Sequence, residues 1–476
     1  MGKVKNKVRV SFVGNAAEGV TGSMTLVTTV QNKKILIECG LSQGESSLLK
    51  EYQKNNQKFK FKPKEIDYVI LLHSHIDHVG LVARLYKEGC KAQIIAPKGL
   101  MKLFEVMARD SAFIMQKDAM ALTKKLKKEF EPIYEEGDVF NALQYWNECN
   151  VNEKVKLDND IEIRFTSSGH IINACQGEIW IKDNHRTVKI GVTSDLGNNE
   201  LQQYYVDKFV PIEQADLLIG ECTYSDKGRK TTKKNRDKDL EKIETVVTQT
   251  CIENKAKILV PIFALQRCQV ILTYLYDIFG DDENFKIPIL IDSPLAIKIC
   301  EIFEEELKGD ALVKFKKVMA WKNVKKLKEF SDTQYYCSSE EPCVLLSCSG
   351  MLTAGRSLFV ASKLLPNPNN HILFCGFATE FSLAGKIKNK KTKTVTIDGV
   401  GIPCRCGITD IKSMTSHMQR DSLLEYYSSY NFTKVALVHG ETESKNEFAR
   451  ELQELIMKKN KTANVISVNK STEILL

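Results

Sequence analysis

Long apolar runs are missing from this chain of 476 residues. No segment approaches the ~20 consecutive apolar residues that a helix needs to cross a bilayer, and the stretch from Met1 to Asn6 lacks the apolar segment of a secretion signal. Hydrophobic residues still make up 43% of the chain, which is typical of a protein that buries a sizeable core. We therefore expect a globular cytoplasmic protein, and the length favours two domains over one.

Closely paired cysteines are also missing. The 14 cysteines are scattered along the chain, and only Cys404 and Cys406 lie close together. Their spacing differs from the paired Cys-x-x-Cys spacing of a structural zinc site. We expect reduced, mostly buried thiols and no disulfide framework.

The chain has little excess charge. Its 68 lysines and arginines against 60 acidic residues give a net charge of +8, which permits a polyanionic partner without requiring one. The basic residues do cluster, first between Lys227 and Lys238 and again between Lys386 and Lys393. Such runs are most often solvated faces, so a nucleic-acid contact is the alternative interpretation of both.

Histidines are few, and their distribution is the strongest signal in the sequence. Three of the 8 histidines fall within residues 73–78, together with Asp77. The apolar run at residues 67–72 predicts a buried strand, and the spacing of apolar residues at 80–89 predicts a helix, so the cluster lies on the loop between them. Ligand sites gather on such loops in α/β proteins. Neutral imidazole and carboxylate groups are good Zn²⁺ ligands, and two pairs this close can serve two neighbouring ions.

Two further candidates stand where predicted strands end. A strand predicted at residues 161–167 leads to His170, and a strand predicted at residues 188–193 leads to Asp195. Alone, each residue is more often a hydrogen-bonded turn residue than a metal ligand. Because both share the structural position of the histidine loop, we predict that they belong to the same metal site.

The first part of the chain shows a simple order of elements. Strands are expected at residues 8–12, 24–30 and 34–40, which together predict a β-meander. A long helix is expected at residues 101–128, and its lysine-rich end suits a helix C-terminus. A second helix is expected near residues 139–149.

The pattern changes from about residue 216. A strand ending at Glu221 is followed by the basic stretch and by a helix at residues 239–253. Strands and helices then alternate, which predicts a parallel sheet. The expected elements are a strand at 257–260, a helix at 266–278, and strands at 287–291 and 343–347.

Near residue 400 the chain is expected to return to the first domain. There His417 precedes a predicted helix, and a strand predicted at residues 434–438 ends in His439. No internal repeat or low-complexity linker marks the boundaries. We therefore divide the chain into residues 1–207 and 399–476, which form one domain, and residues 208–398, which are inserted into it.

Short motifs form an ordered set along the chain, together with the His-x-His-x-Asp-His pattern of residues 73–78. They are Thr21-Gly22-Ser23, Gly169-His170, Ser194-Asp195-Leu196-Gly197, Glu221-Cys222-Thr223-Tyr224, Pro261-Ile262-Phe263-Ala264, Asp292-Ser293-Pro294-Leu295-Ala296, Ser349-Gly350-Met351 and Val438-His439-Gly440-Glu441. This set resembles the β-CASP branch of the metallo-β-lactamase superfamily, which includes ribonuclease J and the endonuclease subunit of the polyadenylation machinery. The resemblance covers nearly the whole chain. It implies an α/β (α+β) fold, a metallo-β-lactamase αββα sandwich with an inserted α/β β-CASP domain.

The resemblance also implies a site for two zinc ions, with manganese as the alternative metal. Carried over residue by residue, it gives each ion three ligands of its own and one shared ligand. His73, His75 and His170 would bind one ion, Asp77, His78 and His439 would bind the other, and Asp195 would bridge them.

Further roles follow from the same resemblance. A hydroxide bridging the two ions would attack the phosphate, with Asp77 and Asp195 in the catalytic group as well as in the ligand set. His417 would act as the general acid that protonates the leaving oxygen, and Glu221 would hold it. An acidic neighbour favours the protonated form of a histidine, which suits this role.

The chain departs from the family pattern at several positions. Glu38 stands where the family usually has an aspartate that braces the histidine loop. Gln266 and Ser225 replace usual glycines, and Met418-Gln419 after His417 replaces the common Ala-Asp. None of these changes removes a metal ligand, so they bear on rate and substrate geometry.

The implied function is hydrolysis of RNA phosphodiester bonds, with 5′-phosphate and 3′-hydroxyl products and single-stranded RNA bound in the cleft between the domains. The expected RNA contacts are Lys230, Lys233, Lys234, Arg267 and Ser349. One alternative is a catalytically weak or inactive RNA-processing scaffold, but inactive relatives tend to lose ligands and none is lost here. The other is a DNA nuclease of the same family. Members that act on DNA tend to carry valine at the position of His439, so histidine there favours RNA.

The mode of cleavage stays open between internal cuts and 5′-to-3′ trimming. We expect a protein without the amino-terminal RNA-binding modules of many archaeal relatives and without the carboxyl-terminal extension of ribonuclease J. Target specificity is therefore expected to come from the cleft or from a partner, either a second copy of the chain or other RNA-processing proteins.

Overall fold

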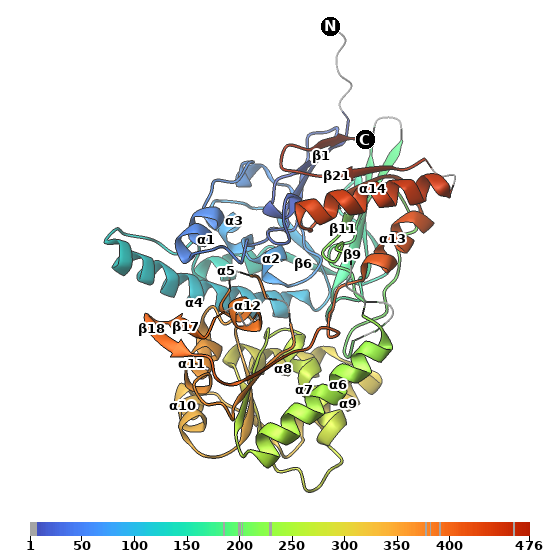
Figure 1. Ribbon diagram of the computed structural model, residues 1–476. Coiled ribbons are helices and arrows are strands. Elements are labelled where there is room, and N and C mark those ends of the chain that lie inside the picture. Colours follow the sequence, from blue (N-terminus) through green and yellow to red (C-terminus); the bar gives the residue numbers. More distant parts are fainter. Residues whose placement is uncertain are drawn as a thin grey trace. The chain divides into compact units, whose positions relative to one another are not determined.

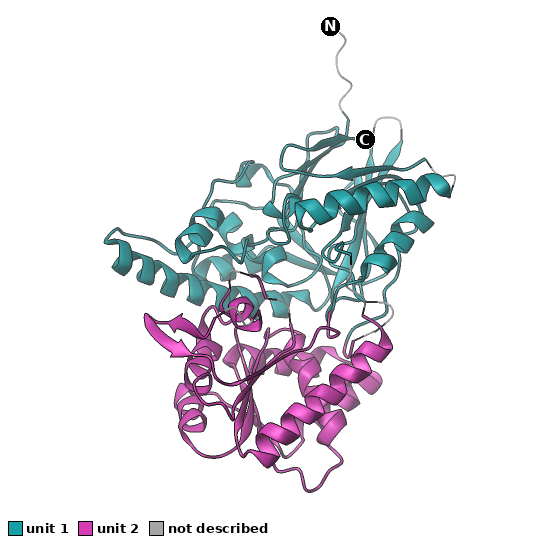
Figure 2. Ribbon diagram, viewed as in Figure 1, with its two compact units in different colours: residues 1–202, 206–230, 416–476 teal, residues 203–205, 231–415 magenta. Residues whose placement is uncertain are grey.

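The computed structural model describes residues 7–183, 186–198, 201, 203–227, 231–376, 378–380, 382–389, 392–459 and 462–476. The chain forms two compact units (Figure 2). The first consists of residues 1–202, 206–230 and 416–476, and the second of residues 203–205 and 231–415. Apart from the short segment 203–205, the chain thus passes between units at 230/231 and 415/416, whereas the sequence places domain boundaries at 207/208 and 398/399. The boundaries at 207/208 and 398/399 remain a prediction.

Within its described residues, the first unit holds two seven-stranded sheets. The first sheet has the order β22-β1-β2-β3-β4-β5-β6. Its strands are β22 (Glu473–Leu475), β1 (Arg9–Phe12), β2 (Thr25–Thr28), β3 (Lys34–Ile37), β4 (Tyr68–Ile70), β5 (Gln93–Pro97) and β6 (Trp146–Cys149). Strands β1, β2 and β3 pair antiparallel, which confirms the predicted meander, and β3 to β6 pair parallel.

The last strand of this sheet corrects one prediction. The helix expected near residues 139–149 is a shorter helix, α5 (Glu136–Leu143), followed by strand β6. Trp146 lies opposite Ile94 of β5, and its ring packs on Phe104 with the ring centroids 4.9 Å apart. Pairing with the sheet edge therefore outweighs the helical spacing of the apolar residues, which is a weaker local preference.

The second sheet has the order β21-β20-β11-β10-β9-β8-β7. Its strands are β21 (Asn464–Ser467), β20 (Asn431–Val438), β11 (Gln214–Glu221), β10 (Thr187–Val192), β9 (Cys175–Lys182), β8 (Ile161–Ser167) and β7 (Lys154–Lys156). Strand β11 pairs parallel with both β10 and β20. Chain segments far apart in sequence thereby lie side by side, and their carboxyl ends meet at one edge of the sheet.

The two sheets pack face to face around a shared apolar core. Residues from both sheets, such as Val10, Ile37, Ile163 and Ile190, belong to one fully buried cluster. Helices cover the two outer faces (Figure 1). On the first sheet lie α3 (Val82–Lys87), α4 (Leu100–Leu126) and α5, and on the second lie α13 (Arg420–Ser429) and α14 (Thr442–Lys458). This arrangement confirms the predicted αββα sandwich. The first unit also contains α1 (Leu48–Asn55) and the short α2 (Ile76–Val79).

The second unit contains, among the residues that the structure describes, a six-stranded sheet of order β14-β13-β15-β12-β16-β19. Every pair in it is parallel, as predicted. Its strands are β14 (Val324–Lys326), β13 (Ile289–Asp292), β15 (Cys343–Ser347), β12 (Lys257–Pro261), β16 (His371–Phe374) and β19 (Gly407–Asp410), and a hairpin joins β17 (Thr394–Ile397) to β18 (Val400–Pro403). The helices are α6 (Lys233–Val247), α7 (Arg267–Phe279), α8 (Pro294–Glu306), α9 (Gly309–Met319), α10 (Phe330–Ser338), α11 (Gly355–Leu364) and α12 (Leu383–Lys388).

The cysteines behave as the sequence predicted. All 14 lie in the described part of the chain, all are free thiols, and all but Cys337, Cys348 and Cys404 are buried. Burial raises the pKa of most of these thiols, for example that of Cys251 to about 12, so they are neutral and unreactive at physiological pH. No helix in the described ranges has the length and apolar character that crossing a membrane requires.

Candidate metal centre

The histidine loop is anchored by the backbone of the neighbouring strand. After β4 the chain passes through His73 and His75 into the short helix α2, which carries Asp77 and His78. The amide of Cys39 donates to the carbonyl of His78 at 2.8 Å, and the amide of Ser23 donates to the carbonyl of Asp77 at 2.8 Å. These bonds, from a residue shortly before the start of β2 and from a residue shortly after the end of β3, hold the loop, so its side chains are oriented before any ligand binds.

Gly40 makes this anchoring possible. A Cβ atom at Gly40 would lie 1.7 Å from the carbonyl oxygen of Asp77, which no side chain permits. A glycine is therefore required where β3 passes behind the loop. The sequence contains this glycine directly after Glu38 and Cys39, but nothing in the pattern predicts which backbone atom it faces.

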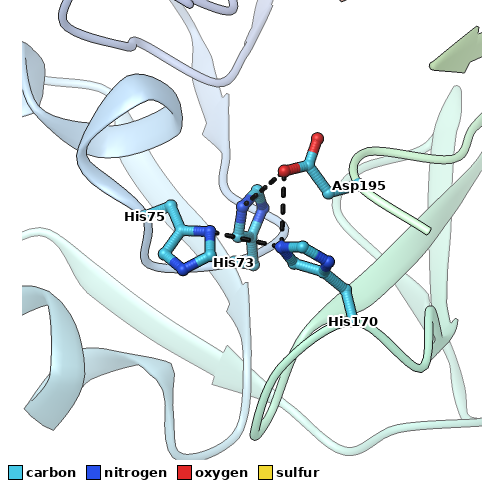
Figure 3. A group of neighbouring side chains, drawn as sticks. All are labelled: His73, His75, His170 and Asp195. Atoms are coloured by element: carbon cyan, nitrogen blue, oxygen red, sulfur yellow. Dashed lines mark hydrogen bonds and ion pairs between the residues drawn. The ribbon is translucent and has the colours of Figure 1, made fainter. Parts of the chain in front are cut away.

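The first group of donors consists of His73, His75, His170 and Asp195, whose ligand atoms all lie within 4.8 Å of one another. Figure 3 shows the three imidazoles turned toward one another and toward the carboxylate of Asp195. Nε2 of His73 and Nε2 of His170 lie 3.5 and 3.4 Å from Oδ2 of Asp195. Nδ1 of His75 lies 3.3 Å from Nε2 of His170. Burial lowers the pKa of His75 to about 3 and that of His170 below its ordinary value, so both rings are neutral and offer lone pairs.

The second group consists of Asp77, His78 and His439. Nε2 of His78 lies 3.2 Å from Nε2 of His439, which in turn lies 3.3 Å from Oδ2 of Asp77. Oδ1 of Asp195 lies 3.3 Å from Nε2 of His78. Asp195 therefore points one oxygen at each group. Asp195 follows the end of β10, and β11 separates β10 from β20, the strand that ends before His439.

The donor set fits divalent cations. In the described part of the chain, Nε2 of His73 and Oδ1 of Asp195 are buried without a hydrogen-bond partner. Such orphaned polar atoms are costly unless something charged satisfies them. Imidazole nitrogens and carboxylate oxygens suit zinc and related transition metals, and two facing groups joined by one carboxylate suit a pair of ions.

Neighbouring side chains orient several donors by binding the ring nitrogen that faces away from the donor group. Nδ1 of His78 lies 2.7 Å from Oε2 of Glu38, and Nδ1 of His439 lies 2.9 Å from the hydroxyl of Thr223. Burial alone would raise the pKa of Glu38, but His78 and His73 lower it well below its ordinary value, so Glu38 is ionised. Glutamate at this position thus reaches the loop that the sequence predicted it to brace. Sequence reasoning did not single out the role of Thr223, because the contact joins positions 216 residues apart.

His417 lies beside this centre with Glu221 as its partner. Nδ1 of His417 is 3.3 Å from Oε1 of Glu221, and Nε2 is 4.0 Å from Oδ2 of Asp195. The loop that carries His417 is joined to that of Asp195, because the amide of Met418 donates to the carbonyl of Leu196 at 2.8 Å. Burial would lower the pKa of His417, but the carboxylates of Glu221 and Asp195 raise it above its ordinary value.

The residues expected to contact RNA are not members of the two donor groups. Lys230 lies outside the described residues, while Lys233 and Lys234 are exposed in the first turn of α6. The guanidinium of Arg267 donates to the carbonyl of Met414, and the hydroxyl of Ser349 lies 3.2 Å from that of Thr353, so each is engaged within the second unit. Their role in RNA binding stays a prediction.

The basic runs also contain internal ion pairs. Lys227 pairs with Glu447, and Lys388 pairs with Asp410 at 2.8 Å. Lys390 and Lys391 lie outside the described residues. One lysine of each run is therefore paired with a carboxylate of its own unit.

Three family models match successive parts of the chain. The metallo-beta-lactamase superfamily model matches residues 17–145, the Beta-Casp domain model residues 268–387, and the Zn-dependent metallo-hydrolase RNA specificity domain model residues 401–464. The last of these ranges contains His417 and His439. The matches follow the order that the motifs predicted.

Similar proteins occur in all three domains of life. Ribonuclease TTHA0252 of Thermus thermophilus is 28% identical over 435 residues, which cover 90% of this chain and 92% of that protein. Transcription termination factor FttA of Methanocaldococcus jannaschii is 24% identical over 466 residues, covering 95% of this chain and 70% of that protein. Cleavage and polyadenylation specificity factor 73 of Drosophila melanogaster is 24% identical over 435 residues, covering 90% of this chain and 59% of that protein.

A solved structure has the same fold. The crystal structure of a protein of unknown function from Enterococcus faecalis V583 superposes with a TM-score of 0.55 and 11% identity, covering 99% of this chain and 100% of that one. A two-sheet αββα sandwich with histidines and aspartates gathered at its strand ends defines a metallo-hydrolase. Within that class, the chain belongs to the β-CASP branch of the metallo-β-lactamase superfamily.

Proposed function

We propose that the protein is a zinc-dependent ribonuclease that hydrolyses phosphodiester bonds in single-stranded RNA and leaves 5′-phosphate and 3′-hydroxyl ends. One observation carries this proposal: a complete donor set for two cations lies beside a separate histidine–carboxylate pair. The match to an RNA specificity domain and the ribonuclease name of the Thermus relative support RNA as the substrate. A cytoplasmic location fits this role.

The ligand roles follow from the two donor groups. His73, His75 and His170 would hold one ion and Asp77, His78 and His439 the other, with Asp195 shared between them. Zinc is the metal that this set suits, and manganese is the alternative. When bound, the two ions would make a water molecule more acidic and offset the negative charge that develops on the phosphate.

His417 would supply the proton that the leaving 3′ oxygen needs. Hydrolysis joins the oxygen of water to phosphorus and breaks the bond to the 3′ oxygen, which leaves as an alkoxide unless it is protonated. His417 is partly accessible while Glu221 is fully buried, so the imidazole can reach a substrate and its partner cannot. Glu221 keeps the ring charged and oriented, and the protonated Nε2 faces the site.

Two alternatives remain distinct from this proposal. A protein that binds RNA without cutting it would keep the fold but has no need of the full donor set, so the intact set favours the enzyme. A DNA nuclease of the same family would use the same donors. Only a direct comparison of the two nucleic acids separates this last alternative.

The decisive experiment measures metal content and products together. Purified protein with zinc should contain about two ions per chain by elemental analysis and lose activity with a chelator. It should be incubated with end-labelled RNA that carries a 5′-triphosphate or a 5′-monophosphate, and with DNA of the same sequence. Cleavage of RNA to 5′-phosphate ends is the expected result, and the ladder of products separates internal cuts from 5′ trimming. Metal-loaded protein that cuts only DNA, or neither nucleic acid, would refute the proposal.

A further inference from the structure

One buried carboxylate holds histidines of both donor groups, but it reaches them in different ways. Oε2 of Glu38 lies 2.7 Å from Nδ1 of His78, which is a direct hydrogen bond. Oε1 of Glu38 lies 3.8 Å from Nδ1 of His73, which is too far for one. The hydroxyl of Ser194 fills this gap, 2.6 Å from Oε1 of Glu38 and 3.0 Å from Nδ1 of His73.

The direction of these hydrogen bonds is determined by chemistry. An ionised carboxylate only accepts, so the single hydroxyl proton of Ser194 goes to Glu38. The hydroxyl oxygen can then only accept from His73, which places a proton on Nδ1. Nε2 of His73 is left with a free lone pair, and it faces Oδ2 of Asp195 at 3.5 Å. The Ser194 hydroxyl thereby selects the tautomer of His73 that a metal ion requires.

Ser194 has a backbone conformation that serine rarely adopts. Its φ of 50° lies in the left-handed region, which glycine adopts without strain and other residues rarely do. Ser194 is only 8% exposed, so contact with solvent does not explain why a hydroxyl is present here. Glycine would fit this backbone better, and the hydroxyl contact with His73 is the gain that offsets the strain.

We propose that Ser194 is a positioning residue that links His73 to the carboxylate of Glu38, so that a single anchor orients one histidine of each ion site. The inference rests on the proposed zinc function and deepens it. It explains how glutamate serves at position 38: one oxygen reaches His78 directly and the other reaches His73 through the serine. Loss of the hydroxyl weakens the site formed by His73, His75 and His170 and spares the orientation of His78.

The test uses Ser194→Gly, because glycine suits the backbone and removes the hydroxyl together with its Cβ, and Ser194→Ala, which removes the hydroxyl alone. Full-length apoprotein is titrated with cobalt(II) in competition with a chelator, and the d–d absorption reports each site. One site should bind ~10–100-fold more weakly, the usual effect of losing an outer hydrogen-bond partner of a ligand. The melting temperature of the apoprotein should stay the same or rise, because the strain at position 194 is relieved. Metal binding thus weakens while stability does not fall, which a merely structural role would not produce.

A matched control is available in Ser168, which is fully buried two residues before His170 and has a hydroxyl without a hydrogen-bond partner among the described residues. Ser168→Ala should leave both cobalt affinities unchanged, and Ser194→Ala should repeat the loss seen with glycine. Equal affinities in wild type and Ser194→Gly would overturn the inference, as would an equal loss at both sites or the same loss in Ser168→Ala. Wild-type protein that binds no cobalt would instead refute the proposed function itself.

Discussion

Nδ1 of His417 lies 3.3 Å from Oε1 of Glu221, and both oxygens of that carboxylate are already fixed by the backbone. Oε1 accepts from the amide of Leu196 and Oε2 from the amide of Thr223, each at 2.9 Å. The pair therefore forms a rigid support next to the metal donors, and it leaves only Nε2 of His417 to face a substrate. Proton transfer and metal binding are thereby assigned to different residues.

The first prediction separates these two tasks. His417→Ala should keep the metal content of wild type and lose on the order of 10²–10⁴ in cleavage rate, the usual contribution of a general acid. The loss should shrink on RNA with a 3′-phosphorothiolate at the scissile bond, because a sulfur leaving group needs no protonation. Rates on both substrates and elemental analysis check this. A variant that loses zinc, or that is equally impaired on both substrates, would contradict the assignment.

The second prediction concerns pH. His417 must be protonated to act, and its pKa is raised by the carboxylates of Glu221 and Asp195, which outweigh burial. The rate should therefore fall as pH rises through this pKa. Glu221→Gln removes one of the charges that raise it, so the alkaline limb of the pH–rate profile should move to lower pH. An unchanged limb would show that another group titrates there, and His417→Ala should lack that limb altogether.

The third prediction concerns Asp195, whose two oxygens face different donor groups. Asp195→Ala should abolish cleavage and weaken both metal sites by more than the ~10–100-fold that loss of an outer partner costs. His439→Ala removes a donor from one group and should weaken only one site. Chelator competition on both variants tests this difference, and circular dichroism checks the fold. Wild-type turnover in Asp195→Ala would exclude the bridging role.

Much of this arrangement could be predicted from short patterns, because each donor follows a strand whose apolar run is clear in the sequence. His73, His170, Asp195 and His439 all stand at such ends. Parallel pairing of β10 and β20 with β11 brings the ends before Asp195 and His439 together. The parallel sheet of the second unit was predictable for the same reason. The alternation of strands with helices and the positions of strand ends are local features of the sequence, so both could be predicted from it.

Other parts depend on contacts that no local pattern contains. Glu38 and Ser194 lie 156 positions apart, and only the packing of the two sheets brings the hydroxyl to the carboxylate. Strand β6 was predicted as helix because its pairing partner, β5, is distant in the sequence and contributes nothing to the local spacing. The points at which the chain passes from one unit to the other likewise depend on which sheet each strand pairs in. Strand β11 lies in the first unit and β19 in the second, whatever their local composition.

The fourth prediction tests the basic stretch. Replacing Lys230, Lys233 and Lys234 by glutamine should weaken RNA binding and flatten its salt dependence, by ~0.7 in the logarithmic slope for each lysine that no longer neutralises a phosphate. Lys124, Lys125 and Lys127 at the end of α4 provide a control, since all three are exposed and their replacement removes the same charge. Titrations at several salt concentrations, on an Asp195→Ala background that does not cut, check this. Equal slopes for both triple variants would assign the stretch to the solvated surface.

The last prediction concerns Gly40, which lies behind the histidine loop. A methyl group at this position would meet the carbonyl oxygen of Asp77 at 1.7 Å, and this carbonyl is already bonded to the amide of Ser23. Backbone cannot yield as a flexible side chain can, so in Gly40→Ala the loop must shift away from β3. We expect a loss of ~1–3 kcal/mol in unfolding free energy, the usual cost of an added methyl group in a packed region. Metal affinity should fall as well, because Asp77 and His78 move with the loop.

Gly137 in α5 is the matched control for this variant. Nothing lies within 4 Å of the position that its Cβ would occupy, so Gly137→Ala removes the flexibility of glycine without a clash. It should leave metal binding unchanged and stabilise the protein by up to ~1 kcal/mol, since alanine favours the helix. Denaturant unfolding of the metal-free proteins gives the stabilities, and cobalt titration gives the affinities. If Gly40→Ala were as stable as wild type and bound both ions equally well, the loop would not depend on the close approach of β3.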